Sequence, residues 1–199
     1  MIDERFIFLG FSLSLYGNLS YLIDTIKGKT KPNRVSWLLW SIAPLIAFFA
    51  EIQKGVGLQS LMTFSVGFGP LLIFLASFLN KKSYWNLNKF DYFYGLLSAI
   101  GIIVWKLTGE GNIAIFFSVL VDLLAGIPTI IKSYIAPESE SYSVYLFSSF
   151  NAIITLLTIK TWTFAHWAFP VYILLIDVVL FSLIKFQIGK KFQKNKPQR

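Results

Sequence analysis

The stretch 122–150 reads DLLAGIPTIIKSYIAPESESYSVYLFSSF. Its first half is an apolar run that contains Pro128 and ends near Ile135. The short polar segment 136–141 follows, and a second apolar run begins at about Tyr142. Two helices joined by so short a loop must lie antiparallel. The stretch therefore predicts a helical hairpin, around which the rest of the chain can be placed.

The composition of the chain indicates a membrane protein. Hydrophobic residues make up 55% of the 199 residues and charged residues only 14%, whereas soluble domains carry about 25% charged residues. The net charge of +8 would suggest nucleic acid in a soluble protein. Here the basic residues lie in short loops and the tail, so we expect no nucleic-acid partner. The absence of Cys excludes thiol catalysis, disulfides and Cys-based metal sites.

Seven apolar runs have about the length that a bilayer core requires, which is roughly 20 helical residues. They cover residues 6–26, 35–52, 58–79, 90–107, 112–135, 142–159 and 166–187. The sequence thus predicts an all-α integral membrane protein with seven transmembrane helices.

The basic residues divide unevenly between the two sides of such a bundle. With the N-terminus outside, 14 Lys and Arg residues lie inside and four lie outside. The outer ones are Arg5, Lys54, Lys106 and Lys160. Because Lys and Arg accumulate in cytoplasmic loops, the split predicts an outside N-terminus and an inside C-terminus. We expect the plasma membrane as the location.

A weak internal repeat accompanies this topology. Shifts of 107 and 108 residues pair three sets of positions: Ser20 with Pro128, Pro44 with Asn151, and Pro70 with Asp177. Residue identity is low, but the order of helices and loops agrees between the two halves.

The repeat predicts a domain organisation of three helices, one helix and three helices. Residues 6–80 would form the first three-helix repeat and residues 112–188 the second, in parallel orientation. A linker helix at 88–107 restores the orientation, and residues 189–199 form a basic cytoplasmic tail.

The hairpin also carries a sequence pattern: Pro128, two apolar residues, Lys132, Tyr134, a polar loop and a second helix that bears Ser residues. This pattern resembles the PQ-loop repeat of SWEET sugar carriers and lysosomal amino-acid exporters, whose Pro-Gln dipeptide is Pro128-Thr129 here. The PnuC vitamin carriers are similar in their three-one-three plan. The resemblance implies a carrier that binds a small solute near the midplane, between the two halves, and works by alternating access.

Asp122 and Asp177 are the main candidates for a solute site. Each lies about 15 Å from the outer end of its run, at about 1.5 Å per residue. A carboxylate near the bilayer centre costs about 2.5–3.5 kcal/mol, so both should face protein or a water-filled cavity. They are candidates for solute binding or proton coupling. A structural acid that bonds to a neighbouring helix is the alternative.

Prolines and amides inside the apolar runs are further candidates. Asn18 and Asn151 could line a polar cavity or bond across helices. Proline removes a helical hydrogen bond and can form a hinge. Prolines surround the gate of SWEET carriers, and the matching positions imply a gate or hinge here, with ordinary packing as the alternative. These candidates are Ser20, Pro44 and Pro128, together with Pro70 in the third run. Small residues predict close helix contacts at Gly17, Gly67, Gly69 and Gly126.

Two loop features complete the expectations. Asn33 or Ser36 could cap the second helix, and we expect Glu138 and Glu140 to be solvated. His166 is the only His in the sequence, so neither a metal site nor another cofactor is expected.

The sequence therefore favours a transporter of a small polar solute, namely a sugar, an amino acid or a vitamin. Membrane lipid is an expected partner, and a homo-oligomer is compatible with the sequence. A non-transporting membrane protein that binds a partner or lipid is the alternative. An enzyme is not expected, because no reactive cluster accompanies the two acids.

Overall fold

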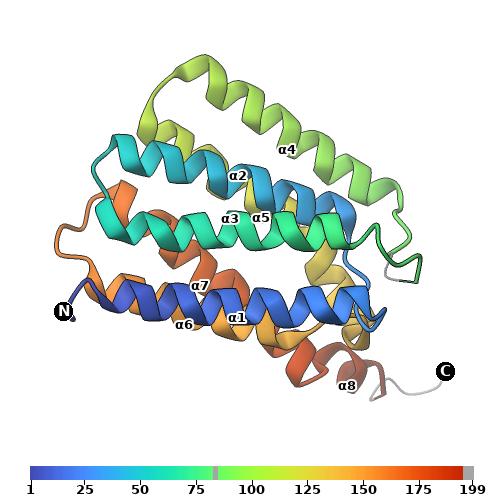
Figure 1. The fold of residues 1–199 in the computed structure, drawn as a ribbon. Helices are drawn as coiled ribbons and strands as arrows, with labels where there is room; N and C mark the ends of the chain where they lie inside the picture. The colour runs from blue at the N-terminus through green and yellow to red at the C-terminus, as the bar shows by residue number, and fades with distance from the viewer. Residues whose placement is uncertain (83–84, 195–199) are drawn as a thin grey trace.

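The structure, a computed structural model, describes residues 1–82 and 85–194. These residues form a bundle of long helices, with no strand in the described ranges (Figure 1). The elements are α1 (Phe6–Ile26), α2 (Arg34–Gln53), η1 (Gly57–Gln59), α3 (Ser60–Ala76), α4 (Lys89–Thr108), α5 (Gly111–Ile135), η2 (Pro137–Ser139), α6 (Tyr142–Thr158), α7 (Phe164–Lys185) and α8 (Ile188–Lys194).

Each of the seven apolar runs coincides with one of the helices α1 to α7. Five segments are long and apolar enough to cross a membrane: α1, α2, the segment Gly57–Ala76, α5 and α7. The apolar helix α6 is shorter. The prediction of an all-α integral membrane protein is confirmed at this level. The end of the predicted basic tail, 195–199, lies outside the described residues.

Helix α1 buries polar residues and exposes apolar ones on its outer face, as expected in lipid. On α1, Ser14 and Asn18 are 1% and 6% exposed, whereas Leu19 and Ile23 are 52% and 45% exposed. In water this arrangement would be unfavourable, because the apolar stripe of a helix then faces the core. In a bilayer the apolar face contacts lipid tails, and polar groups find partners only inside the protein.

The order in which the helices pack is the same in the two halves of the chain. Helix α3 packs against both α1 and α2, and α7 packs against both α5 and α6. Between the halves, α1 packs against α6 and α2 packs against α5. Helix α4 lies on the outside of the bundle against α5 and α2 (Figure 1).

The connections alternate between the two ends of the bundle. The N-terminus lies at one end with the loops before α3, α5 and α7, and α8 lies at the other end with the loops before α2, α4 and α6 (Figure 1). Lys29 and Lys81 therefore lie at the α8 end, and Lys54 and Lys160 at the N-terminal end. These described members of the two groups of basic residues that the sequence separates therefore lie at opposite ends.

The predicted close contacts at small residues are confirmed. A Cβ atom on Gly17 would lie 3.2 Å from the Cα of Val144, and one on Gly67 would lie 2.8 Å from the Leu45 side chain. A Cβ on Gly69 would lie 2.1 Å from the Asn18 Cγ, so the Asn18 side chain occupies that space. A Cβ on Gly126 would lie 2.8 Å from the Ile176 side chain. Because Gly126 lacks this atom, there is room for Ile176 and for Trp40. Small residues thus let α1 approach α3 and α6, and let α5 approach α7.

Asn33 caps α2, as predicted, and also anchors α4. Its Oδ1 accepts hydrogen bonds from the backbone N–H groups of Val35 and Ser36. Its Nδ2 donates to Asp91 Oδ1 at 2.7 Å. Asp91 also belongs to the capping box that begins α4. One amide therefore joins the first loop to the start of the outer helix.

Candidate functional site

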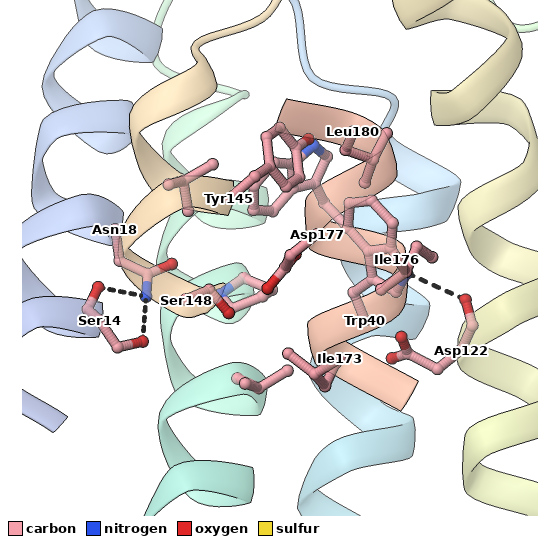
Figure 2. Close-up of a pocket in the computed structure, with 14 residues that line it drawn as sticks. Ser14, Asn18, Trp40, Asp122, Tyr145, Ser148, Ile173, Ile176, Asp177 and Leu180 are labelled. Atoms are coloured by element: carbon pink, nitrogen blue, oxygen red, sulfur yellow. Dashed lines mark hydrogen bonds between the residues drawn. The ribbon is translucent and has the colours of Figure 1, made fainter. Parts of the chain in front are cut away.

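A central cavity of about 50 Å³ lies inside the bundle (Figure 2). Helices α1, α2, α3, α5, α6 and α7 all contribute to its wall. Four of the residues predicted for the site or the gate line it together: Asn18, Pro70, Asp122 and Asp177. The packing of α3 and α7 between their neighbours brings these distant positions to one place.

Asp122 on α5 is 2% exposed and is held by two neighbours. Its Oδ2 accepts a hydrogen bond of 2.7 Å from the Tyr172 hydroxyl on α7. Its backbone carbonyl accepts one of 3.0 Å from Trp40 Nε1 on α2. Its Oδ1 has no hydrogen-bond partner among the described residues. The carboxyl is therefore fixed in position and retains one oxygen that can accept a bond.

Asp177 on α7 is 6% exposed and lies beside Ser148 of α6 (Figure 2). Its Oδ2 has no hydrogen-bond partner within the described part of the chain. Two carboxyl groups, from α5 and α7, thus line one cavity, each with an unused acceptor oxygen. Such buried polar atoms are uncommon, because each unpaired group costs about 1–3 kcal/mol.

Asn18 supplies the polar wall on α1. Its Nδ2 donates to the Ser14 carbonyl at 2.9 Å and to the Ser14 Oγ at 3.4 Å (Figure 2). Both residues line the cavity. The Asn18 side chain packs against α3 in the space left by the missing Cβ of Gly69.

Three aromatic side chains form another part of the wall. Trp37 and Trp40 meet edge to face with ring centroids 5.4 Å apart. Trp40 and Tyr145 do the same at 6.5 Å. All three line the cavity. Aromatic side chains of this kind can contact apolar groups and, over their faces, cations.

A buried ion-pair cluster lies between the cavity and the α8 end of the bundle. It consists of Lys132, Glu140, Tyr21 and Tyr145. The Lys132 Nζ lies 2.5 Å from Glu140 Oε1 and also donates to the Lys31 carbonyl. Glu140 Oε2 accepts from the Tyr21 hydroxyl at 2.6 Å and from the Tyr145 hydroxyl at 3.3 Å. The cluster joins α1, α5 and α6 at this end.

The expectation that Glu140 is solvated is wrong. Its side chain is completely buried, because the loop folds back over Lys132 at the end of α5. Glu138 is exposed, as predicted, and lies 2.7 Å from Lys190 of α8. That hydrogen bond lowers the pKa of Glu138 below its ordinary value.

The other predicted site residues lie away from the cavity. Asn151 is fully buried, and its Nδ2 donates to Ser65 Oγ of α3 at 3.0 Å. Ser20 is half-buried and accepts a hydrogen bond of 3.4 Å from Ser143 of α6. Pro44 and Pro128 lie inside α2 and α5 and are buried there.

Sequence reasoning missed several polar residues that the structure brings into play. Tyr172 holds Asp122, and nothing in its sequence context distinguishes it from the many other aromatic residues. Glu51 on α2 is 1% exposed and accepts a hydrogen bond of 3.0 Å from Thr63 on α3. Glu51 could have been identified from the sequence, because it is an acidic residue within an apolar run.

The cavity wall combines polar, aromatic and aliphatic side chains. The residues that line it include no Lys, Arg or His. No group of three or more His, Cys, Asp or Glu in the described residues could hold a metal ion. The available chemistry is therefore hydrogen bonding by an amide and hydroxyls, two carboxyl groups, and contact with aromatic rings.

Comparisons with known protein families, with curated proteins and with solved structures gave no match.

Proposed function

We propose that the chain is a carrier that moves a small polar solute across a membrane by alternating access. Seven helices would span the bilayer, with the N-terminus outside and the C-terminus inside. Helices α1 to α3 and α5 to α7 would be the two halves, and α4 the linker between them.

The observation that carries this proposal is the cavity. Two buried carboxyl groups with unused acceptor oxygens line it, at a depth where polar groups are costly. All six helices of the proposed halves contribute to its wall. A site at the interface of two repeats is the usual plan of a secondary transporter.

The packing order supports the two halves as a repeat. A twofold axis along the membrane normal would exchange α1 with α5, α2 with α6, and α3 with α7. The same axis would place the contact between α1 and α6 onto the contact between α5 and α2. Both contacts are extensive. The placement of α3 and α7 follows the same rule.

Charge supports the proposed topology. The connections that carry most of the basic residues lie at the α8 end, and the opposite end carries few of them. This distribution agrees with a cytoplasmic α8 end.

The buried ion-pair cluster supports a closed state at that end. Because Tyr145 belongs both to the cavity wall and to the cluster, opening the cavity toward α8 would disturb the Glu140 hydrogen bonds. A carrier needs such a closure, which forms and breaks during the cycle.

Uptake by proteoliposomes tests the proposal. We expect the protein to take up at least one of four radiolabelled probes: glucose, glycine, thiamine or tetramethylammonium. Asp177→Asn keeps the shape of the side chain and removes its charge, so uptake should fall at least about tenfold. If Asp177 couples transport to protons, the variant loses pH-driven accumulation but keeps exchange. If it only binds solute, both activities fall together.

Asp3→Asn is the matched control, since it removes an equal charge from an exposed position outside the bundle. Its uptake should equal that of the wild type. Unchanged uptake and pH dependence in a folded Asp177→Asn protein would remove Asp177 from the site. A loss of thermal stability in detergent would identify a structural acid instead.

A further inference from the structure

The charges around the cavity are not balanced by the protein. Within the described part of the chain, Asp122 and Asp177 each present an unpartnered oxygen, and no basic residue belongs to the wall. The titratable groups that face them, Tyr172 and Tyr145, are neutral donors when protonated. Lys132 is buried nearby, but its ammonium pairs with Glu140. Two buried carboxyl groups therefore need protons or a bound cation to balance them.

The aromatic residues of the wall favour an organic ammonium group over an inorganic ion. Trp40 and Tyr145 lie on the same cavity as the two acids (Figure 2). Trp37 lines it as well. Aromatic faces attract ammonium groups, and sites of this composition recognise alkylated amines. An inorganic ion that has lost its water shell would instead require several oxygen ligands around it. The combination of acids and rings thus favours an organic ammonium group.

The size of the cavity limits the solute. A volume of about 50 Å³ corresponds to about one to two water molecules. A solute that fits with small side-chain movements has only a few non-hydrogen atoms. A carboxylate on that solute would be repelled by the two acids, and no basic residue in the wall would offset the repulsion.

We propose that the cavity binds a small organic ammonium cation that carries no carboxylate. This proposal names the class of solute for the proposed carrier. It rests on the carrier function only in so far as the bound cation is also the transported solute. Binding by itself requires only the cavity.

Equilibrium dialysis of the full chain in detergent against radiolabelled tetramethylammonium tests the proposal. The cation has as many non-hydrogen atoms as the neutral tert-butanol and the zwitterion glycine, which makes these two matched competitors. We expect saturable binding that neither competitor displaces in excess. Asp177→Asn should weaken binding at least about tenfold, and Asp122→Asn should do the same. Asp3→Asn should leave it unchanged.

Three outcomes would overturn the proposal: no saturable binding, displacement of the bound cation by excess tert-butanol or glycine, or binding unaffected by both Asn substitutions. Thermal melting of each variant shows whether a loss of binding follows from unfolding. The two proposals fail separately. A protein that takes up another probe and does not bind the cation overturns this inference alone. Binding of the cation without uptake of any probe overturns the carrier.

Discussion

Replacing Lys132 with Met is expected to lower the free energy of unfolding by about 3–5 kcal/mol, because it leaves the Glu140 carboxylate buried without its cation. The Lys132 and Glu140 side chains are 1% and 0% exposed, and Nζ and Oε1 lie 2.5 Å apart. The Tyr21 and Tyr145 hydroxyls remain but cannot supply the missing charge. Reversible unfolding of the purified protein in mixed detergent measures the change.

The chain provides a matched control at the same end of the bundle. Lys190 and Glu138 form a second Lys–Glu pair at 2.7 Å, but these side chains are 45% and 60% exposed. Lys190→Met should change the stability by less than about 1 kcal/mol, because water screens an exposed pair. The double variant Lys132→Met, Glu140→Leu should recover most of the lost stability. Equal losses in Lys132→Met and Lys190→Met would show that the buried ion-pair cluster does not stabilise this end of the bundle.

A second large effect is expected from the topology of the chain. The chain lacks Cys, so a single Cys can be introduced at any position without background. Cys at Lys54 or Lys160 should react with an impermeant thiol reagent added to intact cells. Cys at Lys29 or Lys81 should react only after the cells are opened. The reason is the placement of these exposed residues at opposite ends of the bundle.

Labelling of Lys29→Cys and Lys54→Cys from the same side of intact cells would contradict the seven-span arrangement. Labelling of Lys29→Cys alone from outside would agree with the seven spans but would show that the chain has the opposite orientation. Labelling at opposite sides thus tests the number of spans, and the side from which each position reacts tests the orientation.

The helices were predictable because lipid imposes a simple rule on sequence. A helix that crosses a bilayer needs a long apolar run, and the charges are confined to the loops. The runs drawn from the sequence therefore agree with α1 to α7 to within a few residues at most ends. Depth in the bilayer also identified Asp122 and Asp177 as inward-facing acids, since neither can face lipid at low cost.

The partners of these acids were not predictable in the same way. Helix rotation decides which buried polar residue faces which neighbour, and a single sequence does not record it. Asn151 is a buried amide like Asn18, yet it bonds to Ser65 and does not line the cavity. Glu140 lies in a polar loop that looks solvated, and only the fold brings it onto Lys132.

The central claim is that the cavity is a solute path open alternately to the two sides, and one measurement tests it without knowledge of the solute. Ser148→Cys places a single thiol on the cavity wall beside Asp177. Ser118→Cys is the control, because Ser118 is 4% exposed on α5, one turn before Asp122, and does not line the cavity. Impermeant thiosulfonate reagents would be applied to right-side-out and to inside-out membrane vesicles. The account predicts that Cys at position 148 reacts from both sides and that Cys at position 118 reacts from neither. A folded Ser148→Cys protein that reacts from one side only, or from neither side, would contradict it.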